Sequence, residues 1–281
     1  MHVQNLIDLI DPKEYDMAVD RLRTFFRGKG FLEVPVQHRL SILAACEDPT
    51  TVAPFIYKGH VWPLPQTGQM WLEYELLTKP QIPGFYCIST SFRNEPDPVP
   101  GRHNLIFPMF EFETHGGLED LATLERELLE SLGFGQASAF HREAYTEVAA
   151  RLHTREITGA HEKKLGEECG PVFFLTHFPL YTSPFWNMKK IGEHANKIDV
   201  LLYGMETIGS AERSTNPDEM RAQFYSISNG MYARMLFSQF TKERVETELE
   251  KFLGLPMIPR CGGGIGMTRM IRALKLAHLL A

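Results

Sequence analysis

Apolar residues recur at helical spacing in several parts of the chain. After Asp11-Pro12, a typical helix start, the apolar positions from Ala18 to Phe26 repeat every three or four residues. This pattern predicts a helix over 11–29. Helices are also predicted over 118–133, 142–153, 217–238, 242–253 and 267–280.

Shorter apolar runs are typical of strands, which are predicted over 31–34, 84–92, 104–113, 171–175 and 198–204. The second and third of these flank a loop rich in proline and glycine, which predicts a long antiparallel hairpin. Because strands and helices interleave and hairpins are prominent, we expect an α+β fold, an antiparallel sheet flanked by helices. No break in composition marks a linker, so residues 1–281 are expected to form one domain.

Composition narrows the class of protein. Of 281 residues, 43% are hydrophobic and 23% are charged. These values are ordinary for a globular protein and exclude a disordered chain, a coiled coil or a collagen-like repeat. The net charge of −6 gives no support for broad nucleic-acid binding. No stretch approaches the ~18 apolar residues of a spanning helix, so no membrane partner is expected.

Cysteine and histidine usage argues against a disulfide framework or a zinc site. The cysteines at 46, 87, 169 and 261 are far apart, with no CxxC pair. The histidines are scattered and lack ligand spacing such as HExxH. The N-terminus carries acidic residues where a signal peptide would carry positive charge. We therefore expect reduced thiols and a cytoplasmic location.

The predicted hairpin and its loop carry the first group of candidate residues: Arg93, Glu95, Arg102, His103, Phe107, Met109, Glu111 and Glu113. Because side chains alternate along a strand, the last four share one face. Arginines around a loop suit a polyphosphate, since each guanidinium offers paired donors to phosphate oxygens. An aromatic ring on the same hairpin would stack a purine. The alternative is an ordinary surface hairpin with charged edges.

A glycine-rich run, 262–266, forms the second group and precedes the last predicted helix. A glycine turn at a helix start brings backbone N–H groups close to an anion. Arg269 on the first helical turn would be disfavoured by the helix dipole unless an anion is bound. The alternative is that glycine is needed for tight strand–helix packing.

Acidic residues near the apolar run 198–204 form the third group. Asp199 and Glu206 would hold Mg²⁺ beside a triphosphate, and Arg213 would pair with a substrate carboxylate. The alternative is a salt bridge between Glu206 and Arg213.

Together these groups resemble motifs 2 and 3 of the class II aminoacyl-tRNA synthetases. The matching segments are Phe-Arg-x-Glu at 92–95, Arg-His-x-x-x-Phe at 102–107 and Gly-Gly-Gly-Ile-Gly-x-x-Arg at 262–269. The resemblance is closest to the aspartyl/asparaginyl/lysyl subclass and covers about residues 14–281. Within it the asparaginyl enzymes look nearest, through segments such as QTGQMWLE at 66–73.

The resemblance implies a role for each candidate residue. ATP would be held by Arg93, Glu95, Arg102, His103, Phe107, Glu206, Gly266 and Arg269. Of these, Arg93 and Arg269 would be catalytic. The amino acid would be held by Glu47, Gln69, Glu111 and Arg213. Mg²⁺ would be bound by Asp199 and Glu206.

The sequence also departs from the family pattern. Leu72 stands where aspartyl enzymes keep a substrate-reading lysine, and Arg260 replaces the usual histidine before the glycine run. Thr268 replaces the acidic residue before the motif 3 arginine, and Pro35 is displaced from the interface position of motif 1, although a homodimer is still expected. Motif 1 begins near residue 20, so no anticodon-binding OB-fold domain of ~100 residues is expected.

Three functions remain open. The first resembles the archaeal-type, ammonia-dependent asparagine synthetases: aspartate is adenylated on its β-carboxylate, and ammonia then gives asparagine, with AMP and pyrophosphate released. The second is a truncated aspartyl/asparaginyl-tRNA synthetase paralog that transfers an amino acid to tRNA, a carrier or a protein lysine. The third is a non-catalytic partner subunit, against which the full set of ATP-site residues counts. A tRNA partner is disfavoured but stays open.

Overall fold

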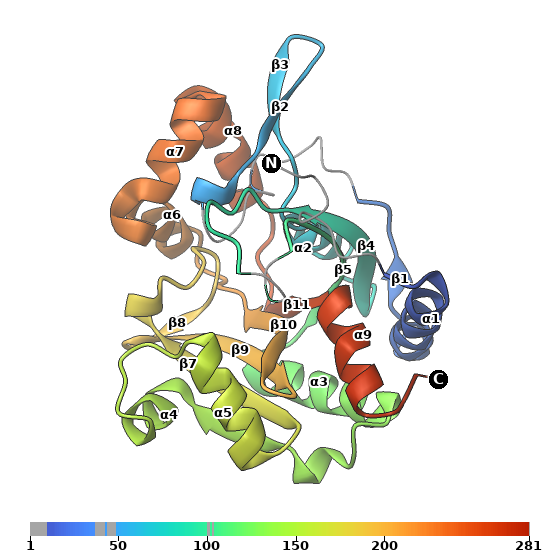
Figure 1. The fold of residues 1–281 in the computed structure, drawn as a ribbon. Helices are drawn as coiled ribbons and strands as arrows, with labels where there is room; N and C mark the ends of the chain where they lie inside the picture. Colours follow the sequence, from blue (N-terminus) through green and yellow to red (C-terminus); the bar gives the residue numbers. More distant parts are fainter. Residues whose placement is uncertain (1–9, 37–42, 44–48, 100–101, 103, 281) are drawn as a thin grey trace.

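A mostly antiparallel sheet runs through the centre of the molecule (Figure 1). The computed structural model describes residues 10–36, 43, 49–99, 102 and 104–280. In this part of the chain the sheet has nine strands in the order β1-β4-β5-β11-β10-β9-β7-β6, with β8 paired to β9. Their bounds are β1 Leu32–Glu33, β4 Gly84–Phe92, β5 Ile106–His115, β6 His141–Ala144, β7 Val172–Pro179, β8 Lys190–Ile191, β9 His194–Leu202, β10 Met205–Glu212 and β11 Arg260–Gly266. Among the strands that the structure describes, only the pairs β1–β4 and β6–β7 are parallel.

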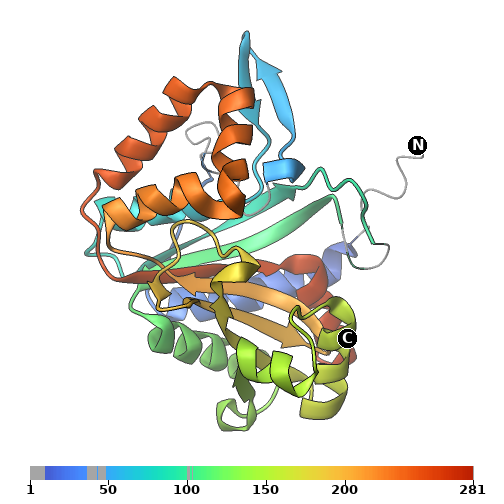
Figure 2. The ribbon, with the colours of Figure 1, turned by 90° about the vertical axis from the view of Figure 1, so that its left-hand side faces the viewer.

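Helices cover both faces of this sheet (Figure 2). Their bounds are α1 Pro12–Gly28, α2 Gln69–Thr78, α3 Leu118–Leu132, α4 Tyr145–Arg151, α5 Gly159–Cys169, α6 Pro217–Ser226, α7 Met231–Phe240, α8 Lys242–Leu253 and α9 Met267–Leu276. A separate hairpin, β2 (Pro54–Tyr57) and β3 (His60–Pro63), projects from the molecule (Figure 1). Within the described ranges, every helix is too short or too polar to span a lipid bilayer.

The main core lies between the sheet and α1, α3 and α9. Leu22 and Phe26 from α1, Leu128 from α3 and Leu274 from α9 are all fully buried there. Fully burying each such side chain contributes roughly 1.5–3 kcal/mol. The predicted start of α1 is confirmed, because the Asp11 side chain accepts hydrogen bonds from the backbone N–H groups of residues 13 and 14. A second core, centred on Trp186, joins α6–α8 to the opposite face.

Two predicted helices were wrong in extent. Residues 141–144 form strand β6, paired with β7, so that only the second part of the predicted 142–153 helix is helical. The predicted 217–238 helix is divided into α6 and α7 by a short turn in which Ser228 and Asn229 have φ angles of 53° and 54°. These left-handed conformations cannot continue an α-helix.

Candidate active site

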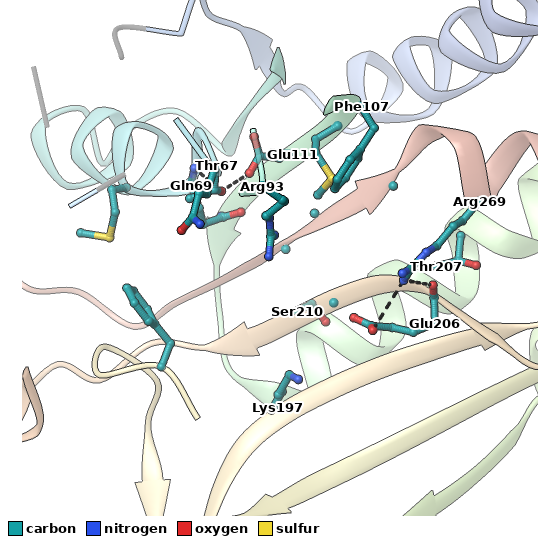
Figure 3. Close-up of a pocket in the computed structure, with 18 of the residues that line it drawn as sticks. Thr67, Gln69, Arg93, Phe107, Glu111, Lys197, Glu206, Thr207, Ser210 and Arg269 are labelled. Atoms are coloured by element: carbon teal, nitrogen blue, oxygen red, sulfur yellow. Dashed lines mark hydrogen bonds and ion pairs between the residues drawn. The ribbon is translucent and has the colours of Figure 1, made fainter. Parts of the chain in front are cut away.

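A pocket of about 300 Å³ lies over the middle of the sheet (Figure 3). The β4–β5 hairpin forms one wall and strands β9, β10 and β11 form the floor. The charged side chains among its lining residues are Glu73, Glu95, Arg93, Arg102, Glu111, Lys197, Glu206, Arg213 and Arg269. Most of the candidate residues from the sequence therefore line one pocket, whereas Asp199 is not among the lining residues and Glu47 and His103 lie outside the described residues.

The predicted shared face of β5 is confirmed. Phe107, Met109 and Glu111 all line the pocket, and Glu113 lies further along the same face, against Arg213. Arg93 follows β4 directly, and its Nε donates a hydrogen bond to Ser91 Oγ at 3.1 Å. The hairpin thus presents an aromatic ring and a guanidinium to one cavity, so it is not merely a surface hairpin with charged edges.

Glu111 holds the N-terminal end of α2 in place. Its buried carboxylate accepts hydrogen bonds from the hydroxyls of Thr67 and Ser89 and, at 2.7 Å, from the backbone N–H of Gly68. Burial raises the pKa of Glu111, while these hydrogen bonds oppose the rise. Because Gly68 immediately precedes α2, this carboxylate positions Gln69 at the pocket wall (Figure 3).

The glycine run was predicted to be a turn before the last helix, and this conformation was wrong. Residues 260–266 form β11, which is paired on both sides by β5 and β10. A Cβ on Gly262 would overlap the Glu113 carboxylate, and one on Gly264 would lie 2.6 Å from the methyl carbon of Met109. The glycines therefore make room for side chains of the neighbouring strands, rather than for the strand–helix packing that the alternative proposed. Gly266 ends β11 and lines the pocket.

Arg269, on the first turn of α9, finds its partners within the protein. Its Nη1 donates to the backbone carbonyl of Glu206 at 2.7 Å and lies 3.6 Å from Glu206 Oε2 (Figure 3). Its Nη2 donates to the carbonyl of Arg102 at 3.3 Å. Arg102 in turn pairs with Glu162 at 2.6 Å. Both arginines line this end of the pocket, and their guanidinium groups suit the terminal phosphates of a nucleotide.

The carboxylates of Asp199 and Glu206 both lie close to the backbone of Gly209. A Cβ on Gly209 would lie 3.2 Å from Glu206 Oε1 and 3.7 Å from Asp199 Oδ1. Mg²⁺ is commonly held by one or two carboxylates together with substrate phosphates, so this donor set fits the ion. No cluster of three or more metal-ligating side chains occurs among the residues that the structure describes, so phosphates and water would have to complete the coordination.

A buried ionic cluster that we call the deep cluster lies at the opposite end of the pocket: Glu73 and Arg213 line the pocket, and Glu113 and Arg260 are buried against them. Arg213 Nη2 donates to Glu113 Oε2 at 3.2 Å and its Nε lies 3.7 Å from Glu73 Oε1. Arg260 Nη2 donates to Glu73 Oε2 at 2.8 Å. The predicted alternative, a Glu206–Arg213 salt bridge, was wrong, because Arg213 pairs with these glutamates and Glu206 pairs with Arg269.

Two amide side chains complete the deep cluster. Gln69 donates to the Glu113 carboxylate and to the Phe112 carbonyl, and Asn187 Nδ2 donates to Glu73 Oε1 at 2.6 Å. Burial raises the pKa of Glu113 to about 7, with Arg213 opposing the rise and Glu73 adding to it. The cluster contains two carboxyl groups and two guanidinium groups, so it offers both donors and acceptors at little net charge.

Sequence reasoning missed Glu73, Asn187 and Lys197 as pocket residues. Glu73 lies four residues after Gln69 on α2, so helical spacing places both on one face. Leu72, by contrast, is fully buried against Leu76 and Phe85. Because the sequence resemblance marks position 72 as a substrate-reading position, the adjacent Glu73 could have been identified from it.

Comparisons with known proteins identify the family and the fold. The family model described as tRNA synthetases class II (D, K and N) matches residues 15–278. An aspartate–tRNA(Asp) ligase of Pyrobaculum aerophilum is 24% identical over 90% of this chain and 61% of its own length. An aspartate–tRNA(Asp/Asn) ligase of Methanopyrus kandleri is 25% identical over 94% of this chain and 64% of its own length.

Solved structures show the same fold. Asparaginyl-tRNA synthetase of Pyrococcus horikoshii, complexed with asparaginyl-adenylate, superimposes with a TM-score of 0.74 at 21% identity, covering 95% of this chain and 65% of that one. The Entamoeba histolytica asparaginyl-tRNA synthetase, also with asparaginyl-adenylate, gives a TM-score of 0.73 at 17% identity, covering 93% and 63%. The chain thus spans less than two thirds of these relatives' lengths. With residues 15–278 matched by the family model, the chain belongs to the class II tRNA synthetases of the D, K and N group.

Proposed function

We propose that this protein is an AMP-forming ligase that activates an amino acid of the aspartate/asparagine class with ATP. The two ends of the pocket differ in chemistry, and Arg93 lies between them (Figure 3). Phe107, Arg102 and Arg269 suit the adenine ring and the phosphates at one end. The deep cluster suits the amino acid at the other end.

The proposed first step joins a substrate carboxylate to ATP. A carboxylate oxygen attacks the α-phosphorus, the bond from that phosphorus to the bridging oxygen breaks, and pyrophosphate leaves. Arg93 would donate to the α-phosphate and to the attacking carboxylate, stabilising the charge that builds there. Mg²⁺, when bound at Asp199 and Glu206, would neutralise phosphate charge. Arg269 and Arg102 would hold the departing phosphates.

The deep cluster supports aspartate activated on its β-carboxylate. A zwitterionic amino-acid head group carries one carboxylate and one ammonium. Arg213 would donate to that carboxylate, and Glu113 or Glu73 would accept from the ammonium. The β-carboxylate would then extend toward Arg93. The paired charges of Glu113 and Arg213, which would match this head group, are the observation that carries the proposal.

The proposed second step is amidation. The ammonia nitrogen attacks the carbonyl carbon of the β-aspartyl adenylate, the C–O bond to AMP breaks with its electron pair, and a proton is lost from the nitrogen. Asparagine and AMP result. Met70, Phe185 and Met188 make the nearby wall apolar, which favours neutral ammonia over ammonium.

Hydroxylamine trapping tests which carboxylate is activated. Purified protein with aspartate, ATP, Mg²⁺ and hydroxylamine should give aspartate β-hydroxamate, and with ammonium it should give asparagine and AMP in equal amounts. The α-hydroxamate, or no amide product, would contradict β-activation and amidation.

The same geometry supports a second candidate, activation of asparagine or aspartate on the α-carboxylate and transfer to tRNA, a carrier or a protein lysine. A carboxamide also needs one donor and one acceptor, which Arg213 and Glu113 supply. Asparagine-dependent pyrophosphate exchange with an α-hydroxamate product would favour it. A labelled tRNA or protein would then identify the acceptor.

We also propose a homodimer formed through the face of α1 and β1. Met17 and Leu32 on these elements are large apolar side chains that are 38% and 50% exposed. Light scattering after gel filtration should give twice the chain mass of 32.1 kDa, and a mass of one chain would contradict the proposal.

A further inference from the structure

Lys197 is a cation in the pocket floor for which the proposed chemistry has so far given no role. It lies on β9 and lines the pocket, with a side chain that is 20% exposed. Its Nζ donates to Asp199 Oδ2 at 3.1 Å and lies 4.3 Å from the centre of the Phe178 ring. Asp199 is two residues further along the same strand, so both side chains point to one face.

These contacts hold the ammonium in place. The ring of Phe178 attracts the cation, and Asp199 fixes the direction in which the side chain extends. A lysine side chain costs up to ~2 kcal/mol of rotamer entropy when it is ordered. Phe178 and Asp199 already order the Lys197 side chain before any ligand binds, so its charge is preorganised in the pocket floor.

Lys197 lies across the pocket from Arg93. Figure 3 shows Arg93 reaching in from the β4–β5 hairpin and Lys197 from the opposite side on β9, with Ser210 beside it. Glu206 and Arg269 lie toward the nucleotide end, and Gln69 lies toward the deep cluster. The space between the two cations is thus the central part of the pocket, where the two proposed substrates would meet.

From this placement we infer that Lys197 binds the α-phosphate of ATP from the side opposite Arg93. This inference rests on the proposed function. An α-phosphate under attack gains charge on its equatorial oxygens, which point to several sides, so one guanidinium cannot reach all of them. A second, preorganised cation on the far side would stabilise the remaining oxygen in the adenylate as well as in the transition state.

Binding of AMP and of adenosine separates this role from a structural one. AMP differs from adenosine by the α-phosphate alone. Calorimetry on Lys197→Met should show AMP affinity reduced about tenfold, the effect expected of one charge-assisted contact, with adenosine affinity unchanged. The matched control is Lys190→Met on the adjacent strand β8, outside the described pocket lining, which should change neither affinity.

Lys197→Arg keeps the positive charge, so it separates loss of the phosphate contact from a folding defect. It should retain AMP affinity within about threefold of the wild type, with an unchanged thermal unfolding midpoint. AMP and adenosine affinities that fall together in Lys197→Met, or an AMP affinity that does not fall, would overturn the inference. So would a fall of tenfold or more in Lys197→Arg that has folded normally.

Amino-acid-dependent pyrophosphate exchange tests the proposed function separately. If the wild type shows no exchange while Lys197→Met loses AMP affinity alone, the proposed function fails and the phosphate contact stands. If the wild type exchanges, Lys197→Met should reduce kcat about 100-fold, as loss of one charge-stabilising group does. Wild-type exchange with an unchanged kcat and unchanged AMP affinity in Lys197→Met would contradict the inference alone.

Discussion

Arg213 Nη2 lies 3.2 Å from Glu113 Oε2, and both side chains are buried, with Arg213 lining the deep end of the pocket. Glu73 lies 3.7 Å from Arg213 on another side. Arg213 is therefore not an isolated positive charge, because two glutamate carboxylates already lie beside it. It belongs to a cluster in which acids and bases alternate, and a substrate that binds here must offer both a donor and an acceptor.

Glu113→Gln should weaken amino-acid binding selectively. Above the pKa of about 7 that burial gives Glu113, the variant removes the negative charge that would attract the substrate ammonium, while an amide of similar shape remains. We expect KM for aspartate to rise about tenfold, equivalent to roughly 1.4 kcal/mol, with KM for ATP unchanged. Steady-state pyrophosphate exchange measures both values. Glu119→Gln, which alters a surface pair with Arg142, is the control, and equal rises in both KM values would contradict the assignment.

Arg260→Met should destabilise the fold. Arg260 is fully buried and pairs with Glu73 through two nitrogens, at 2.8 and 3.0 Å. Its removal leaves Glu73 partly uncompensated in the interior, which costs about 3–5 kcal/mol of unfolding free energy. Urea denaturation measures the loss. Arg151→Met, which breaks the exposed pair with Glu143, should cost less than ~1 kcal/mol, and similar losses in the two variants would refute this account of the deep cluster.

Phe107→Ala should weaken nucleotide binding. The ring lines the pocket on the same face of β5 as Met109, and in the proposed function it would stack on adenine. Loss of a base–aromatic stack costs about 1–3 kcal/mol, so KM for ATP should rise roughly ten- to one-hundredfold. KM for the amino acid should stay constant. Phe55→Ala, on strand β2 of the projecting hairpin, serves as the control. An unchanged KM for ATP in Phe107→Ala would exclude stacking.

Glu125→Gln should change how stability depends on pH. Glu125 on α3 is fully buried, and burial raises its pKa from 4.5 to about 8, with the Ser210 hydroxyl opposing the rise and the Asp199 charge adding to it. The folded protein thus binds a proton that the unfolded chain releases above pH 4.5. Between pH 4.5 and about 8 the stability supplied by this proton is lost as pH rises, at up to ~1.4 kcal/mol per unit.

Urea denaturation at pH 6 and pH 8.5 measures this effect. The wild type should lose more unfolding free energy between the two values than Glu125→Gln, whose amide does not titrate. Glu119 has a pKa lowered by Arg142, so its stabilisation is lost only as pH falls, and Glu119→Gln should match the wild type over this interval. Parallel losses in the wild type and Glu125→Gln would show that Glu125 is not the titrating group.

Local pattern was enough to predict one wall of the pocket. The alternation of β5 places Phe107, Met109 and Glu111 together because the pleat of a strand depends only on neighbouring residues. Arg93 and Arg102 could be assigned to the same cavity because they bracket the loop of that hairpin. The core helix α1 was also predictable, since its cap and its apolar spacing lie within one segment.

The floor of the pocket, formed by β9, β10 and β11, could not be predicted from the local sequence pattern. Glycines have low strand propensity, so 262–266 was interpreted as a turn, whereas the need for glycine arises from the side chains of Glu113 and Ser210 on neighbouring strands. Lys197 enters the pocket only through the pairing of β9 with β10, in which Gly209 lies opposite Asp199. Such registers depend on contacts between distant segments, which the spacing of one segment does not contain.

Amino-acid-dependent ATP–pyrophosphate exchange across the twenty amino acids, with and without ammonium, tests the central claim most directly. The account predicts exchange with aspartate or asparagine alone, and, for aspartate with ammonium, formation of asparagine together with AMP. Exchange driven by an amino acid outside this class, or no exchange with any of them, would contradict it.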